Sequence, residues 1–175
     1  MRQALAIRLL AMDVDGVLTD GVLYLGRSGE ELKAFHVHDG LGLALARGAG
    51  LQVAFVTGRS SEAVRRRAGE LGVEHLLEGV RHKGEALRDL ARRLELPREA
   101  VAFVGDDLND LPAFAACGLP IAVADAPARV RAAAAWVTQA RGGRGAVREV
   151  VECILAVQGR LDDAVARYLA GERCQ

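Results

Sequence analysis

The segment RLLAMDVDGVLTDG, residues 8–21, joins an apolar run directly to two aspartates that stand one residue apart. A continuous apolar run that ends at polar residues is typical of a strand buried on both faces of a parallel sheet. Two carboxylates at the end of such a strand do not help the fold, because like charges repel. The segment therefore predicts a central strand over residues 8–14 and a functional role for Asp13 and Asp15.

Three further apolar runs repeat this pattern, and segments of helical period separate them. These runs are residues 51–56, 100–105 and 119–123. Between them, apolar residues recur at helical spacing in residues 60–72 and 83–96. Alternating buried strands and helices are typical of an α/β fold with a doubly wound parallel sheet and helices on both faces. We therefore predict a Rossmann-like fold, in one domain over residues 1–175.

One segment departs from this alternation. In residues 21–37, two runs flank the sequence GRSG at 26–29, which is typical of a projecting β-hairpin. The short stretch of chain between Asp15 and Thr57 leaves room for this hairpin and one helix, but not for a cap domain. An open site gains from cover that excludes water. Because residues 22–25 of the hairpin are apolar, we expect it to pack against a second copy in a homo-oligomer.

Composition excludes several classes of partner. The 23 basic and 23 acidic residues cancel, so no overall charge draws the protein toward nucleic acid or an anionic membrane. No apolar stretch approaches the roughly 20 residues of a membrane helix. Cys117, Cys153 and Cys174 are far apart and match no metal or redox spacing, which favours a reducing compartment. We expect a cytoplasmic protein that binds neither nucleic acid nor membrane.

Polar groups follow three of the predicted strands. Asp13 and Asp15 follow the first, Thr57, Gly58 and Arg59 the second, and GDDLND at 105–110 a later one, while Lys83 begins a helix between the last two. Open α/β sheets bind ligands at the carboxyl ends of their strands. We therefore expect these groups to meet at one edge of the sheet.

The acidic groups at this edge require a cation. They are Asp13, Asp15, Asp106, Asp107 and Asp110. Two unit charges about 4 Å apart repel by roughly 4 kcal/mol at an effective dielectric constant of about 20, so the group needs compensation. Carboxylate ligands favour a hard ion, and Mg²⁺ is commonly held by one or two carboxylates together with a substrate phosphate.

The remaining groups suit a phosphate. Thr57 offers a hydroxyl group, the N–H of Gly58 can approach closely, and Lys83 carries a positive charge. One carboxylate can attack phosphorus and form an aspartyl-phosphate, while a second protonates the leaving oxygen and later activates water. Asp13 and Asp15 can divide these two tasks.

These motifs carry a resemblance to a known family. DVDGVLTD at 13–20, VTGR at 56–59, Lys83 and GDDLND stand in the order found in the haloacid dehalogenase-like phosphatases, which this chain resembles. The resemblance implies that Asp13 is the nucleophile, that Asp15 is the general acid and base, and that Thr57 and Lys83 bind the phosphoryl group. The implied metal ligands are Asp13, the backbone carbonyl of Asp15 and Asp106, supported by Asp107 and Asp110.

A narrower resemblance covers nearly the whole chain. FHVHDGLGL at 35–43, VADA at 123–126 and GGRGAVREV at 142–150 make it similar to the 3-deoxy-D-manno-octulosonate 8-phosphate phosphatases. That family consists of capless, Mg²⁺-dependent homotetramers that act in lipopolysaccharide precursor synthesis, so the resemblance implies a phosphorylated sugar acid as substrate. It implies substrate contacts from Asp15, His36, His38, Asp39, Gly40, Gly58, Arg59, Arg67, Lys83 and Arg144, the last in a C-terminal tail over residues 140–175 that approaches a neighbouring site.

Ordinary structural roles compete with several of these assignments. Asp13 or Asp15 alone could cap a helix, and Lys83 or Arg67 could belong to a solvated helix face. His36 and His38 could pack against a partner, which we prefer to metal ligation because the carboxylates already suit a hard ion.

Two other functions remain open. One is a phosphatase that acts on a nonulosonic acid 9-phosphate and shares the capless architecture. The other is a phosphoacceptor receiver domain, which also uses aspartates, a threonine and a lysine. In receivers the acceptor aspartate follows a middle strand, whereas here the strand that ends at Val56 is followed by Thr57. This order argues against the receiver.

Overall fold

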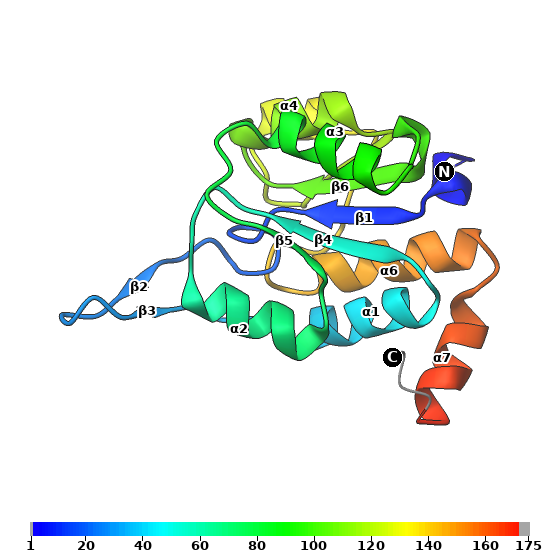
Figure 1. Cartoon of the computed structure of the whole chain (residues 1–175), viewed down its shortest axis with the longest axis horizontal. Coiled ribbons are helices and arrows are strands. Elements are labelled where there is room, and N and C mark those ends of the chain that lie inside the picture. Colours follow the sequence, from blue (N-terminus) through cyan, green and yellow to red (C-terminus); the bar gives the residue numbers. More distant parts are fainter. Residues whose placement is uncertain (1, 172–175) are drawn as a thin grey trace.

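A six-stranded parallel sheet forms the centre of the computed structural model, which describes residues 2–171 (Figure 1). The strand order is β5-β4-β1-β6-β7-β8. The strands are β1 (Leu9–Met12), β4 (Gln52–Val56), β5 (His75–Leu77), β6 (Val101–Gly105), β7 (Leu119–Ala122) and β8 (Trp136–Val137). The four predicted runs are β1, β4, β6 and β7, which confirms the α/β fold. Met1 and residues 172–175, with Cys174 and the end of the expected tail, lie outside the described part of the chain.

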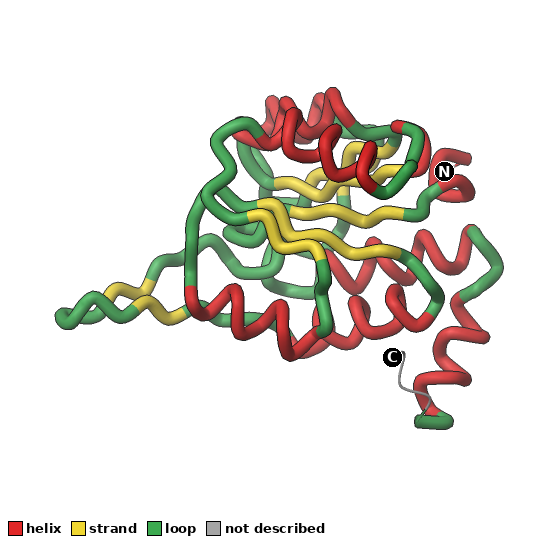
Figure 2. Tube along the Cα trace, viewed as in Figure 1, coloured by secondary structure: helices red, strands yellow, loops and turns green. Residues whose placement is uncertain are grey.

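Helices cover both faces of the sheet (Figures 1 and 2). On one face lie α1 (Val37–Gly48), α2 (Glu62–Leu71) and α6 (Ala146–Val157), and α7 (Leu161–Leu169) packs against α1 and α6. On the other face lie α3 (Lys83–Arg93) and α4 (Leu111–Ala116), with α5 (Ala128–Ala133) beside α4. Short 3₁₀ helices are η1 (Arg2–Ala6), η2 (Arg98–Ala100) and η3 (Leu108–Asp110). Within residues 2–171, every helix is too short or too polar to span a bilayer.

The expected C-terminal tail begins instead with a core helix. Val147, Val150, Val151, Ile154 and Leu155 of α6 are all fully buried, and α6 packs along α1. These apolar residues recur at helical spacing, so burying their shared face stabilises the fold. The description of residues 140–175 as a tail is therefore wrong for residues 146–157, and truncation after Gln139 would remove part of the core.

The predicted hairpin projects from the body of the protein (Figures 1 and 2). It consists of β2 (Tyr24–Leu25) and β3 (Glu31–Leu32), which pair antiparallel across the turn at residues 26–29. Its apolar side chains face solvent in the single chain, with Leu25 71% and Leu32 65% exposed. The hairpin ends earlier than expected, because Val37 already begins α1. Only the hairpin and α1 lie between β1 and β4, so this segment contains no cap domain.

Candidate active site

Strand register brings the ends of β1, β4 and β6 to one level. Met12 pairs with Phe55 on one side and with Val104 on the other. The residues that follow these strands therefore emerge side by side at the carboxyl edge of the sheet. They surround a cavity of about 410 Å³ that is lined by Asp13, Asp15, Thr57, Gly58, Arg59, Asp106, Asp107, Leu108 and Asn109. The three polar clusters that follow the predicted strands thus meet as expected.

Asp13 occupies the centre of this group and is only 5% exposed. Its Oδ1 accepts a hydrogen bond from the backbone N–H of Val14 at 2.7 Å, and its Oδ2 lies 2.6 Å from Lys83 Nζ. Burial, together with the nearby charge of Asp110, raises the pKa of Asp13 to about 6, although Lys83 acts in the opposite direction. The ammonium of Lys83 thus directly faces the carboxylate of the expected nucleophile.

Lys83 is a buried cation at the start of α3. Its Nζ lies between Asp13 Oδ2 and Asp110 Oδ1, the latter 2.7 Å away. Burial would lower the pKa of Lys83, but the charges of Asp13 and Asp110 outweigh burial and raise it. The following residue, Gly84, lets α3 approach α4 closely, since a Cβ there would lie 2.5 Å from the carbonyl oxygen of Pro112. Helix packing thus places a permanent positive charge beside the proposed nucleophile.

Asp110 organises the loop that follows β6. Its side chain is fully buried, and its Oδ2 accepts hydrogen bonds from the backbone N–H groups of Asp106 at 2.9 Å and Asp107 at 3.3 Å. Asp107 in turn caps η3 by accepting a hydrogen bond from the N–H of Leu108. Both oxygens of Asp110 are therefore occupied within the protein, so its main contribution is to shape the loop.

Asp106 carries the feature that fits a divalent cation. Its Oδ1 is buried and has no hydrogen-bond partner among the described residues. Oxygens of Asp13, Asp106 and Asp110 lie within 4.8 Å of one another. Burial, followed by the charges of Asp110 and Asp13, raises the pKa of Asp106 to about 8. A buried carboxyl oxygen without a partner beside other carboxylates suits a hard cation, which would displace the proton of Asp106, and Asp13 and Asp106 have the side chains best placed to hold it.

The loop after β1 packs tightly against this acidic group. Gly16 adopts a φ of +91°, and a Cβ at this position would lie 2.0 Å from Asp106 Oδ2. Only glycine combines this backbone conformation with so close an approach. Gly16 therefore lets the first motif approach the last motif closely.

Asp15 and Thr57 also line the cavity, and the side chain of Asp15 is the more exposed of the two. Thr57 is 2% exposed, and its Oγ1 accepts a hydrogen bond from the N–H of Arg59 at 3.2 Å. The carboxylate of Asp15 makes an ion pair with Lys33 through Oδ1, and its Oδ2 lies 3.8 Å from Arg59 Nε. Sequence reasoning missed Lys33, because no motif or spacing connects this hairpin residue to the aspartates.

Several residues implied as substrate contacts do not line this cavity in the described chain. His36 precedes α1, and its ring lies edge-on to that of His38. The guanidinium of Arg67 lies over the ring of Phe35 and pairs with Glu70 at 3.2 Å. Lys83 is not in the lining either, but its Nζ lies 2.6 Å from Asp13 Oδ2. The others outside the cavity are Asp39, Gly40 and Arg144, whose guanidinium lies 3.4 Å from Asp20 Oδ2. Their roles in substrate binding stay predictions.

Asp39 has a clear structural role instead. It is 1% exposed, and its carboxylate accepts hydrogen bonds from the backbone N–H groups of Gly145 at 3.2 Å and Arg148 at 2.8 Å. These N–H groups belong to the start of α6, where no helical carbonyl is available to them. Asp39 therefore ties α1 to the first turn of α6 across the helical layer.

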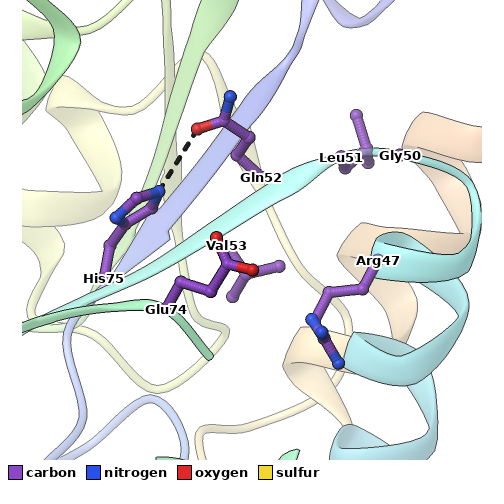
Figure 3. Close-up of a pocket in the computed structure, with 7 residues that line it drawn as sticks. All are labelled: Arg47, Gly50, Leu51, Gln52, Val53, Glu74 and His75. Atoms are coloured by element: carbon purple, nitrogen blue, oxygen red, sulfur yellow. Dashed lines mark hydrogen bonds between the residues drawn. The ribbon is translucent and has the colours of Figure 1, made fainter. Parts of the chain in front are cut away.

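A second cavity lies at the opposite end of the strands. It has a volume of about 180 Å³ and is formed at the amino ends of β4 and β5 together with the end of α1. Figure 3 shows its lining, where His75 Nε2 and Gln52 Oε1 are 3.2 Å apart. Its charged lining residues are Arg47 and Glu74, without an acidic cluster. This second cavity therefore does not offer the chemistry expected from the motifs.

Comparison with known proteins agrees with this geometry. The haloacid dehalogenase-like hydrolase family matches residues 76–150. A 3-deoxy-D-manno-octulosonate 8-phosphate phosphatase of Escherichia coli K12 is 49% identical over 158 residues, which cover 90% of this chain and 84% of the relative.

Solved structures show the same likeness. The 3-deoxy-D-manno-octulosonate 8-phosphate phosphatase of Yersinia pestis matches with a TM-score of 0.90 and 46% identity, over 92% of this chain and 87% of that chain. The enzyme of that name from Moraxella catarrhalis matches with a TM-score of 0.92 and 43% identity, over 95% of this chain and 96% of that chain. That structure was solved with a magnesium ion, a phosphate ion and a KDO molecule. Sequence and fold agree, and the chain belongs to the haloacid dehalogenase-like hydrolases, within the family of 3-deoxy-D-manno-octulosonate 8-phosphate phosphatases.

Proposed function

We propose that this protein is a Mg²⁺-dependent phosphatase that hydrolyses 3-deoxy-D-manno-octulosonate 8-phosphate to the free sugar acid and phosphate, in lipopolysaccharide precursor synthesis. The observation that carries the proposal is the cavity in which the buried carboxylate of Asp13 lies beside Lys83, Thr57 and the unpartnered oxygen of Asp106. Relatives named 3-deoxy-D-manno-octulosonate 8-phosphate phosphatase are 49% identical to the chain over most of its length, which supports the choice of substrate.

The reaction follows from the positions of two carboxylates. An oxygen of Asp13 attacks phosphorus, the bond from phosphorus to the sugar oxygen breaks, and Asp15 donates a proton to that oxygen. Water then attacks the aspartyl-phosphate while Asp15 accepts its proton, which releases phosphate and restores both side chains. Thr57 Oγ1 and Lys83 Nζ orient and neutralise the phosphoryl oxygens. The carboxylates of Asp13 and Asp106 would hold Mg²⁺, which would supply positive charge to the phosphoryl group.

The first prediction concerns substrate choice. With Mg²⁺ present, kcat/KM for the octulosonate 8-phosphate should exceed that for a nonulosonic acid 9-phosphate by about 100-fold, because discrimination depends on contacts with the remote part of the sugar acid. Phosphate release from a panel of sugar-acid phosphates measures this ratio. Equal values for the two substrates would favour the nonulosonic acid phosphatase, and a stable acyl-phosphate without turnover would favour the receiver.

A homotetramer is the second part of the proposal. Apolar side chains gather on the hairpin and are exposed in the single chain, among them Tyr24, Leu25 and Leu32. Packing between copies would remove this surface from water, which is how exposed apolar patches are usually used. Residues that lie away from the cavity in one chain, such as His36, His38 and Arg144, could then contribute to a neighbouring site. A cytoplasmic location stays a prediction from the cysteine pattern.

The second prediction tests this assembly. A double variant, Leu25→Glu and Leu32→Glu, should convert the tetramer into smaller species, because it places charges in the apolar contact. Light scattering coupled to gel filtration measures the mass. Leu169→Glu on α7, where the side chain is 77% exposed, is the matched control and should remain tetrameric. A wild-type protein that is monomeric at micromolar concentration would contradict the proposal.

A further inference from the structure

Lys33 is a buried cation beside the site that the proposed reaction does not use. Its side chain is only 1% exposed. Its Nζ contacts Asp15 Oδ1 and lies 2.8 Å from Glu31 Oε1. A lysine that gives up most of its hydration needs compensating partners, and here two carboxylates supply them. The hairpin thus contributes a charge that reaches the proposed general acid.

Four charges form a closed ring around this contact. Glu31 Oε2 lies 3.2 Å from Arg59 Nη2, and Arg59 Nε lies 3.8 Å from Asp15 Oδ2. Positive and negative groups therefore alternate in the order Asp15, Lys33, Glu31 and Arg59. The contact with the Lys33 ammonium, with a smaller contribution from Arg59, lowers the pKa of Glu31, which keeps this member anionic. The ring connects three segments, namely the loop after β1, the hairpin and the loop after β4.

The ring determines how the carboxylate of Asp15 is oriented. The terminal torsion of an aspartate is broad, so its two oxygens are interchangeable unless partners hold them. Here Lys33 takes Oδ1, and Arg59 lies near Oδ2. Asp15 and Arg59 line the 410 Å³ cavity, whereas Lys33 and Glu31 do not. Lys33 Nζ is held by the carboxylates of Asp15 and Glu31, so it is placed to support Asp15.

We propose that Lys33, held by Glu31, is a positioning residue that orients the carboxylate of Asp15 for proton transfer to the leaving oxygen. This inference rests on the proposed function, in which Asp15 is the general acid and base. It makes the hairpin part of the catalytic apparatus within its own chain, in addition to any role in assembly. The effect of Lys33 should then depend on how strongly the leaving group needs a proton.

Two substrates separate this role from a structural one. A sugar oxygen must be protonated as it leaves, whereas the oxygen of 2,4-dinitrophenyl phosphate leaves as a stable anion. The quantity to compare is kcat/KM, because it reports only the steps up to release of the leaving group, while kcat also includes hydrolysis of the aspartyl-phosphate. Lys33→Met keeps most of the apolar stem and removes the charge.

The third prediction is a selective loss in this variant. For the sugar-acid phosphate, kcat/KM should fall by about 10- to 100-fold, within the range that general acid catalysis contributes. For 2,4-dinitrophenyl phosphate it should fall by no more than about twofold, and Lys33→Arg should recover part of the first loss. Glu31→Gln should show the same selectivity with a smaller loss. Arg27→Met, an exposed change in the turn of the same hairpin, is the matched control and should leave both values unchanged.

Asp15→Asn shows which hypothesis has failed if the result differs. In this variant, kcat/KM should fall for the sugar-acid phosphate but not for 2,4-dinitrophenyl phosphate. Adding Lys33→Met to it should cause little further loss, because both changes remove the same function. If Asp15→Asn is not selective, the assignment of Asp15 fails. If Asp15→Asn is selective but Lys33→Met and Glu31→Gln affect both substrates equally, or neither, then the positioning role of Lys33 is wrong and the proposed reaction stands.

Discussion

Asp13→Asn is expected to reduce hydrolysis of phosphate monoesters by a factor on the order of 10⁴ or more, since an amide cannot form the covalent intermediate. The side chain keeps its shape, and its amide oxygen can still accept the hydrogen bond from the N–H of Val14. Because burial and Asp110 raise the pKa of Asp13 to about 6, its charge opposes folding in the metal-free protein at neutral pH. The variant should therefore be at least as stable as the wild type without metal.

Three measurements test this prediction. Steady-state phosphate release gives the rate. Acid quenching during turnover of a substrate with a labelled phosphoryl group should trap the labelled aspartyl-phosphate in the wild type only. Urea unfolding compares the stabilities of the two proteins. Asp89→Asn on α3 is the matched control, because it removes an exposed aspartate that pairs with Arg92 away from the cavity. Substantial activity in Asp13→Asn, or a labelled protein in that variant, would contradict the assignment of the nucleophile.

The metal-free protein is expected to lose stability as the pH rises from about 4 to about 8. In this interval Asp106, with a pKa of about 8 in the folded state against an ordinary 3.8, holds a proton that the unfolded chain has released. Asp13 behaves in the same way up to a pKa of about 6. The folded state thus binds more protons than the unfolded state, so the free energy of unfolding falls with rising pH, by several kcal/mol in total.

Mg²⁺ should reverse this loss, and by more at higher pH, because it binds the ionised carboxylates and displaces their protons. Urea unfolding at several pH values between 5 and 8, with and without Mg²⁺, measures both effects. Asp106→Asn is the comparison: it should flatten the pH dependence, abolish most of the stabilisation by Mg²⁺, and lower activity by about 100-fold or more. Stabilisation by Mg²⁺ that is equal at all these pH values would argue against a cation between these carboxylates.

The sequence pattern was sufficient to predict the central strands of the sheet. β1, β4, β6 and β7 are apolar runs that lie wholly or mostly within the core, so each carries its own signal. The edge strands β5 and β8 were not predicted. β5 has three residues of intermediate burial and β8 has two, and such short, half-exposed strands have no distinctive pattern. Only hydrogen bonding to β4 and β7, respectively, defines them.

Sequence by itself also determined where the reactive groups lie, because each stands directly after a strand and parallel strands end at one edge. Asp13, Thr57 and Asp106 could be placed together for this reason. It did not determine the partners of these groups. The Lys33–Asp15 and Lys83–Asp110 ion pairs join residues 18 and 27 positions apart, and the hydrogen bond from Arg148 to Asp39 spans 109 positions. Such contacts have no period in the sequence, since they depend on how the hairpin, α3 and α6 pack against the sheet, and packing is what the tertiary structure decides.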